Sequence, residues 1–294
     1  MLHITNGTAT QIPLPGEVVY WIDALCEGPV PGGLSLRDTS RVRERYFPEF
    51  GVSFEGRDRS LETAGEHEEV VLWFEHDLYD QLQLIQILNF IRPARARLTL
   101  ICVDRYLGPM PSAELEALFP QRREVTAEQL RLAHEAWTAF TSTEPRNVER
   151  LVHASTAALP FLQGALLRHL QQFPSKLNGL SRTEQQILEI VSSGITRRKA
   201  IFGANQDREE RIFMGDCFFY RYLDHLCDAT VPLLERKGDE VALTREGHRV
   251  LNCRADAVDL NGLDRWFGGA HFETDGPDWR WDVSTNRLYL RNNS

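Results

Sequence analysis

Long apolar runs are the first thing that this 294-residue sequence lacks. Its densest apolar stretches, such as Val70–Phe74, are far shorter than the roughly 18 residues that a membrane-spanning helix needs. The first residues carry neither a basic region nor an apolar core, so we expect no secretion signal. The five cysteines include no CxxC pair, which is typical of reduced thiols, and we therefore expect a cytoplasmic protein.

Net positive charge is missing as well. Lys+Arg 33 against Asp+Glu 42 gives a net charge of −9, which repels nucleic acid and anionic membranes at long range. A glycine-rich phosphate loop is also absent, because Asn6-Gly7-Thr8 is a turn and no GxGxxG opens a helix. We expect neither a nucleic-acid nor a membrane partner, and a dinucleotide site is unsupported. The sequence identifies no cofactor.

What the first third does contain is an alternation of strands and a helix. Apolar runs predict four strands, and apolar residues at helical spacing predict one helix that stops at Pro93. The nearly continuous apolar character of two of these strands is typical of parallel strands covered on both faces. The sequence therefore predicts an α/β fold with a parallel, Rossmann-like sheet, from the strands Leu2–Thr5, Glu17–Ile22, Glu69–Phe74 and Leu98–Val103 and the helix residues Leu78, Leu82, Ile85, Leu88 and Ile91.

Every predicted strand ends at polar residues. In parallel sheets, ligands bind beyond the carboxyl ends of the strands, so these polar groups should converge on one edge. We assign the catalytic role to Glu75, His76 and Asp77. The residues expected to bind substrate are Asn6, Asp23, Glu27, Gln81, Asp104 and Arg105.

Each catalytic candidate has an alternative interpretation. Asp77 is well placed to cap the helix that begins at Leu78, with Asp80 at its third position. His76 is either a proton-transfer group or a packed histidine. An unpaired carboxylate such as Glu75 is costly between a buried strand and a helix, which favours a chemical role. Carboxylates and an imidazole could also hold a metal, but no spacing in the sequence requires one.

Two segments between the strands leave further questions. Only Thr8–Gly16 separates the first two strands, so either they are not a parallel pair or their connection is abbreviated. In the segment 27–54, the arginines either clamp an anionic group or form a solvated face, and we favour the solvated face. The residues Ser53–Glu68 are polar and predict a mobile loop that covers the site. The arginines are Arg37, Arg41, Arg43 and Arg45.

Four stretches of this first third resemble one bacterial family: LHITNG, WIDALCEGPVPGGL, LWFEHDLYDQLQLIQIL and LTLICVDRYLG. The family is the bacterial domain-of-unknown-function family 1835, and residues 158–189 and 260–272 resemble the region that accompanies it. The resemblance implies no activity. It implies that the family's characteristic residues correspond to Trp21, Glu27, Gly28, Trp73, Glu75, Asp77 and Gln81. In that family an Asp and a helix usually follow the first Asn-Gly, where this chain has Thr8 and a short loop.

The remaining chain predicts three further parts, in keeping with a length that favours more than one domain. Residues 1–125 form the α/β domain, 126–180 a helical linker layer, 181–253 a winged-helix-like module and 254–294 a β-rich tail. Capping boxes at Thr126 and Ser181 mark two helix starts, and Asp216 is expected to cap a third helix. The hairpin expected within Pro232–Thr244 would be the wing.

A winged helix makes DNA binding the obvious rival function. Acidic residues outnumber basic ones by one in 181–253, and the third helix offers mainly aromatic residues, so packing or dimerisation fits better. A homodimer through the aromatic residues Phe218–Tyr222 is one possibility, and we expect Tyr220 to be at least half buried. The sequence therefore predicts an enzyme, hydrolytic or group-transferring, that acts on a small polar metabolite. The alternative is a DNA- or protein-binding regulator or adaptor.

Overall fold

The computed structural model describes residues 1–92 and 95–291, so Pro93 lies outside the described residues. The chain forms two compact units. The first comprises Met1–Leu167 and Trp266–His271, and the second comprises Arg168–Arg265 and Phe272–Ser294. The helical stretch expected at 126–180 is therefore shared between the two units. Within the described part of the chain, no helix combines the length and the apolarity that a membrane crossing requires.

The first unit is built on a sheet with the strand order β2-β1-β4-β5-β6. The first four strands in this order are parallel and β6 is antiparallel. This is the predicted α/β, Rossmann-like arrangement, and the expected parallel sheet is confirmed. The strands are β1 (Leu2–Asn6), β2 (Glu17–Trp21), β4 (Glu69–Phe74), β5 (Arg97–Cys102) and β6 (Arg123–Glu124).

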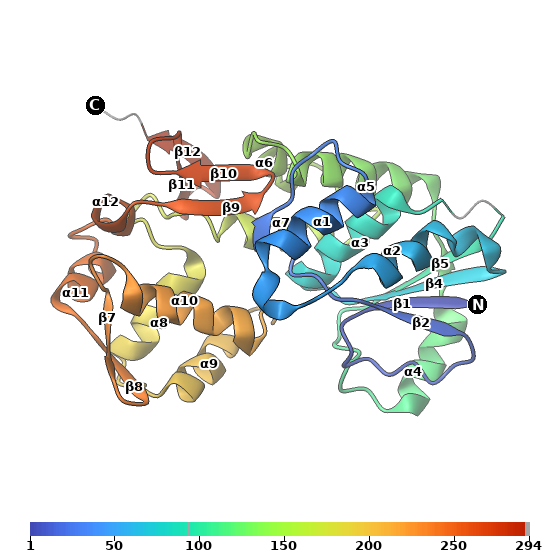
Figure 1. The fold of residues 1–294 in the computed structure, drawn as a ribbon, viewed down its shortest axis with the longest axis horizontal. Coiled ribbons are helices and arrows are strands. Elements are labelled where there is room, and N and C mark those ends of the chain that lie inside the picture. Colours follow the sequence, from blue (N-terminus) through green and yellow to red (C-terminus); the bar gives the residue numbers. More distant parts are fainter. Residues whose placement is uncertain (93–94, 292–294) are drawn as a thin grey trace. The chain divides into compact units, whose positions relative to one another are not determined.

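Helices cover both faces of this sheet, which explains why β4 is apolar along its whole length (Figure 1). Val71 and Trp73 face a cluster with Leu115 and Leu118 of α4 (Ser112–Leu118). On the other side lies α3 (Leu78–Phe90), which packs against α5 (Ala127–Phe140). The capping box expected at Thr126 opens α5. The other helices that begin in this unit are α1 (Leu36–Tyr46), α2 (Glu55–Glu62), α6 (Arg146–Val152), α7 (Leu162–Leu170), η1 (Pro48–Phe50), η2 (Ala64–Glu66) and η3 (Phe119–Gln121).

The first two strands are parallel neighbours joined without a helix, so the abbreviated connection is the correct interpretation. Leu2 lies opposite Glu17, and the Glu17 amide donates to the Met1 carbonyl at 3.2 Å. Gly16 allows this close return, because a Cβ there would lie 2.8 Å from the Met1 oxygen and its φ of 145° is rare for other residues.

The expectation of a polar, mobile loop at residues 53–68 is wrong. Residues 53–68 are not a polar loop but contain α2, whose Arg57 and Leu61 are buried. The Arg57 guanidinium lies over the rings of Trp21 and Phe54, at 4.4 and 3.8 Å from their centroids, which accounts for a buried arginine in a polar-looking sequence.

The arginines of α1 divide into exposed and buried groups. Arg41 pairs with Asp38 on the solvated face, as expected. Arg43 points inward instead, and its Nη2 lies 2.6 Å from Asp23 Oδ1. Both partners are almost fully buried, and Arg43 also donates to the backbone carbonyls of Ala24 and Glu27. The solvated-face expectation is therefore wrong for this one residue.

A short strand pair closes the first unit. β3 (Gly28–Pro29) pairs in parallel with Phe267 and Gly268 of β9 (Asp264–Gly268), and β10 (Ala270–Glu273) follows. Gly269 is required at the turn, since a Cβ there would lie 1.9 Å from the Thr141 carbonyl oxygen.

The second unit contains the helices and the hairpin that the sequence predicts. Ser181 and Glu184 form the expected capping box, but Gly215 rather than Asp216 occupies the cap position of α10. Tyr220 is mostly buried and contacts Phe202, so its burial is as expected. That these elements act as a winged helix stays a prediction. They are α8 (Arg182–Ser192), α9 (Arg198–Gln206), α10 (Asp216–Asp228), β7 (Leu234–Lys237), β8 (Glu240–Leu243) and α11 (Arg245–Leu251).

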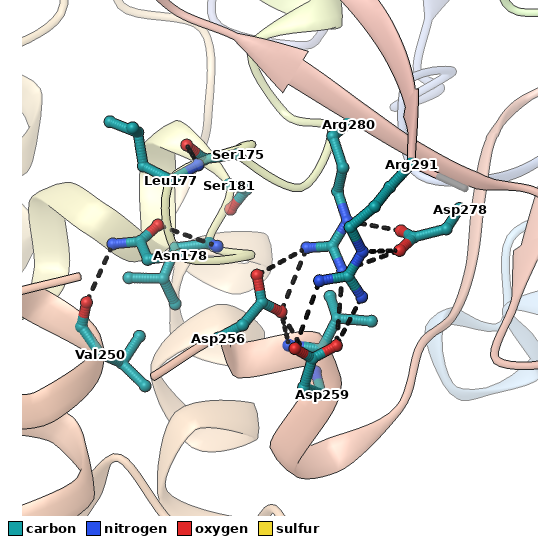
Figure 2. Close-up of polar contacts among 12 residues, drawn as sticks. Ser175, Leu177, Asn178, Ser181, Val250, Asp256, Asp259, Asp278, Arg280 and Arg291 are labelled. Atoms are coloured by element: carbon teal, nitrogen blue, oxygen red, sulfur yellow. Dashed lines mark hydrogen bonds and ion pairs between the residues drawn. The ribbon is translucent and has the colours of Figure 1, made fainter. Parts of the chain in front are cut away.

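An ion-pair network holds the C-terminal hairpin of the predicted β tail within the second unit (Figure 2). The tail hairpin consists of β11 (Asp278–Asp282) and β12 (Arg287–Arg291), and α12 (Ala257–Asn261) precedes it. The buried Arg280 donates to Asp256 Oδ2 at 3.0 Å and also pairs with Asp278. Arg291 of the neighbouring strand pairs with Asp259 of α12. Two guanidinium groups thus bind three carboxylates, which fixes the hairpin on the helix.

We expect Arg43→Ala to destabilise the first unit by about 3–5 kcal/mol, because it leaves the buried Asp23 carboxylate without its main partner. The matched control is Arg41→Ala on the same helix, whose exposed pair should contribute nothing measurable. Urea unfolding of both variants tests this. Equal midpoints for the two variants would contradict the account.

Candidate active site

Three carboxylates meet at the carboxyl end of β4. Glu75 directly follows the strand, Asp77 precedes α3, and Asp80 lies in its first turn. One oxygen from each lies within 4.8 Å of the others. We call Glu75, Asp77 and Asp80 the carboxylate cluster.

Hydrogen bonds to the backbone fix the turn that carries this cluster. Asp77 caps α3, since its Oδ1 accepts the amides of Tyr79 at 2.9 Å and Asp80 at 3.2 Å. Asp80 Oδ1 accepts the Glu75 amide at 2.7 Å. The capping interpretation of Asp77 is therefore confirmed. It does not exclude a chemical role, because capping uses only one of the two carboxylate oxygens.

Neighbouring strands also contribute to this edge. Asn6 at the end of β1 donates its side-chain amide to Asp80 Oδ2. The Gln83 side chain donates to Asn6 Oδ1 and to the Asp23 carbonyl, both at 3.0 Å. One helix thus connects the ends of β1, β2 and β4, which is the convergence expected from the strand ends.

The loop after β5 contacts Glu75. Its Oε1 accepts the Leu107 amide at 2.6 Å, and the Gly108 amide also contacts this carboxylate. Gln81 of α3 donates to the Glu75 carbonyl at 2.6 Å and lies 3.5 Å from the sulfur of Cys102. Glu75 is therefore held on both sides, by the loop through its side chain and by α3 through its backbone.

Burial and mutual repulsion control the protonation of the cluster. Burial and the negative charge of Glu75 raise the pKa of Asp77 to about 7. Hydrogen bonds from Asp80 and Tyr79 oppose this shift. Burial and the charges of Asp77 and Glu75 raise the pKa of Asp80 well above its usual range. Burial also raises the pKa of Glu75, against the effect of the Leu107 and Gly108 amides. Within the described chain, none of the three forms an ion pair with Arg, Lys or His.

Cys102 lies beside this cluster, in surroundings that disfavour a thiolate. Burial raises the pKa of its thiol to about 12, with a smaller contribution from the charges of Asp80 and Asp77. The group is therefore neutral at physiological pH, and a neutral thiol is unreactive. We assign it a packing role next to Gln81.

His76 is buried against two rings of the same unit. Its ring lies 5.1 Å from that of Tyr106 and 6.0 Å from that of Phe161. Its chain position between Glu75 and Asp77 keeps it next to the cluster, and the packed-histidine interpretation accounts for the ring contacts.

The other residues assigned to substrate binding have partners outside the cluster, or lie exposed. The Asp23 carboxylate pairs with Arg43 and Arg57. The carbonyl of Glu27 accepts from Arg43. Asp104 and Arg105 are exposed in the loop after β5, and Arg105 lies 3.5 Å from Glu114. Their roles in binding a substrate stay predictions.

Sequence reasoning missed two parts of this site. The sequence marks Asp80 only as a helix-start residue, although its spacing of three from Asp77 places both at the first turn of α3. The amides of Leu107 and Gly108 have no sequence signal, because any residue supplies a backbone N–H.

The polar groups at this edge are carboxylate oxygens and neutral side-chain amides, and such groups suit two kinds of chemistry. Adjacent carboxyl groups with raised pKa values transfer protons near neutral pH. Carboxylate oxygens are also the preferred ligands of hard divalent cations, and Glu75, Asp77 and Asp80 are the residues that could hold one.

A comparison with protein-family models finds no match to this chain, and a comparison with curated proteins also finds none. Membership of the bacterial domain-of-unknown-function family 1835 therefore stays a prediction from the motifs. The site is interpreted from its own geometry.

The pH dependence of stability tests the electrostatics of the cluster. Asp77 binds its proton more tightly in the folded state, with a pKa of about 7 against an ordinary 3.8, so its contribution to stability is lost as the pH rises through this range. Asp77→Asn keeps the cap and removes the titration. We expect the wild type to lose about 2–3 kcal/mol more than this variant between pH 5 and pH 8, since each of the two pH units between 5 and the pKa of about 7 corresponds to about 1.4 kcal/mol.

Asp38→Asn is the control for this measurement. Asp38 lies at the third position of α1, and its hydrogen bond from Ser35 holds the pKa of that carboxyl below its usual range. It is ionised throughout pH 5–8, so this variant should follow the wild-type slope. An Asp77→Asn curve parallel to the wild type would contradict the coupled, buried cluster.

Proposed function

We propose that the first unit is an enzyme that acts on a small polar metabolite by hydrolysis or group transfer. The observation that carries this proposal is the carboxylate cluster, which lies at the carboxyl edge of a parallel sheet and has no ion-pair partner among the described residues. Structural carboxylates elsewhere in this chain pair with arginine, as Asp23 does with Arg43. Keeping three carboxylates buried and unpaired is costly, which supports a chemical use.

Glu75 is the proposed general acid or base. It is the most accessible member of the cluster, and the Leu107 and Gly108 amides hold its carboxylate in place. The raised pKa of Glu75 makes it a better proton acceptor than an exposed carboxylate. Asp77 and Asp80, in contact with each other, can hold a proton between them and return it to the reacting group.

Neutral groups around the cluster would orient the substrate. Asn6 and Gln81 present amides from β1 and α3, and His76 is adjacent in the chain. Arg105, at the exposed end of the β5 loop, is the proposed contact for an anionic part of the substrate. The absence of a GxGxxG motif in the sequence supports hydrolysis or group transfer over hydride transfer.

The proposal places this enzyme in the cytoplasm. All five cysteines are free thiols, which fits a reducing compartment.

The alternative is a regulator or adaptor that binds DNA or protein through the second unit. Three helices followed by the β7–β8 hairpin support it. The ion pairs weigh against DNA, because Arg198 pairs with Asp224 at 2.6 Å and Arg197 lies 3.4 Å from Glu240. Within α10, Tyr220 contacts Phe202 and Arg198, so its ring already packs inside the module. A homodimer would therefore use the outer residues of this helix, such as Phe218.

Metabolite screening tests the enzymatic proposal. Wild-type protein is screened by thermal shift against small phosphoesters, carboxylic acids, amides and nucleosides, and each stabilising compound is then followed by NMR for turnover. We expect Glu75→Gln to lower kcat by about 10²- to 10⁴-fold, as is typical for the loss of a general acid or base, without loss of folding.

Glu114→Gln provides the matched control, because this carboxylate is exposed and pairs only with Arg105 among the described residues. It should retain turnover within about twofold. Equal rates for the wild type and Glu75→Gln, or no turnover of any compound class, would contradict the proposal.

A further inference from the structure

We propose that Glu75, Asp77, Asp80 and the side-chain oxygen of Gln81 bind one hard divalent cation. This inference deepens the proposed function by naming a cofactor class for the same site. Cation binding is measured without substrate, so it can be tested separately from turnover.

The spacing of the carboxylates fits a single ion. One oxygen from each of the three side chains lies within 4.8 Å of the other two. Two oxygens on opposite sides of Ca²⁺ are separated by about 4.6–5.2 Å, and on opposite sides of Mg²⁺ by about 4.0–4.2 Å. The spacing of at most 4.8 Å is therefore compatible with a Ca²⁺-sized ion, whereas a smaller ion requires the oxygens to lie within about 4.2 Å of one another.

Gln81 is the independent observation that points to a ligand. Its side chain is fully buried, and its Oε1 accepts no hydrogen bond in the described part of the chain. A buried carbonyl-type oxygen without a donor is costly, and amide oxygens are regular ligands of hard cations. A cation would satisfy this oxygen where no protein donor does.

The position of the Gln81 amide places it at the cluster. Its Nε2 donates to the Glu75 carbonyl at 2.6 Å, and Oε1 is bonded to the same carbon. The amide nitrogen also lies 3.5 Å from Cys102 Sγ, at the end of the neighbouring strand β5. The amide therefore lies among the groups that surround the carboxylates.

The existing hydrogen bonds leave room for a metal. Asp77 uses Oδ1 for the helix cap, and Glu75 uses Oε1 for the Leu107 amide. An ionised carboxylate offers about four lone-pair positions, so an oxygen that accepts one hydrogen bond can still bind a cation, and Asn6 would act as an outer partner that orients Asp80. All four donors are oxygens, which favours Mg²⁺, Mn²⁺ or Ca²⁺ over Zn²⁺ or Cu²⁺.

A bound cation would supply Lewis-acid chemistry to the proposed reaction, by polarising a substrate oxygen or a water molecule. The protein residues would fix its position at the strand ends.

Calorimetric titration tests the inference. The full-length protein is stripped with EDTA, freed of chelator and titrated separately with Mg²⁺, Mn²⁺ and Ca²⁺, and Mn²⁺ binding is followed in parallel by electron paramagnetic resonance. We expect one site per chain and a higher melting temperature with at least one of the three ions. Asp77→Asn, which keeps the helix cap, should weaken binding at least tenfold.

Two buried glutamines of α3 provide a matched pair of variants. Gln81→Leu should weaken the same ion at least tenfold. Gln86→Leu should bind it like the wild type, because Gln86 is equally buried but accepts from Trp21 Nε1 at 2.8 Å, away from the cluster. Absence of saturable binding of all three ions by the wild type up to about 1 mM, a limit that includes the weaker Ca²⁺ modules, would overturn the inference. Equal affinity in the wild type and Gln81→Leu would overturn it as well.

The two proposals fail in different ways. Cation binding at this site without turnover of any metabolite leaves the cation inference standing and counts against the enzyme. Turnover that persists in EDTA, in a protein that binds none of the three ions, supports the enzyme and overturns the cation site.

Discussion

The hydrogen bonds from the first turn of α3 to the Asp77 carboxylate determine how the rest of this site is arranged. They fix where the helix begins after β4, and they turn Asp80 back toward the Glu75 amide. From this start, α3 carries Gln83 to Asn6 of β1 and to the backbone of Asp23. A single capping interaction thus aligns the ends of three parallel strands, which is where ligands bind in sheets of this kind.

The same cap has an electrostatic cost. It brings a third carboxylate next to two others in a buried place, and no described residue supplies an arginine of the kind that balances Asp23 or Asp256. The fold tolerates this arrangement because backbone amides donate to all three carboxylates. A site that holds charge through backbone amides keeps its carboxylates free for a proton, a cation or a substrate.

Much of the fold followed from local pattern, and the exceptions have physical causes. The β4 run and the α3 stripe carry enough apolar residues to define strand, helix and parallel order. The burial of Arg43 and Arg57 could not be predicted from the sequence. It depends on Asp23 and on the rings of Trp21 and Phe54, which only the fold brings next to these arginines. Glu75 and Asp77 were predictable from their position at a strand end. The hydrogen bond from the Leu107 amide to Glu75 was not predictable, because every residue except proline has a backbone amide and only the fold brings this one to Glu75.

The central claim is that Glu75, Asp77 and Asp80 form one coupled, buried acid–base group. The most direct measurement is a ¹³C NMR titration of the side-chain carboxyl carbons in cation-free protein, with each residue assigned by its Asn or Gln variant. The account predicts that Asp77 titrates near pH 7, that Asp80 titrates above its ordinary range, and that each signal responds when the other ionises. Three independent titrations near pH 4 would contradict it.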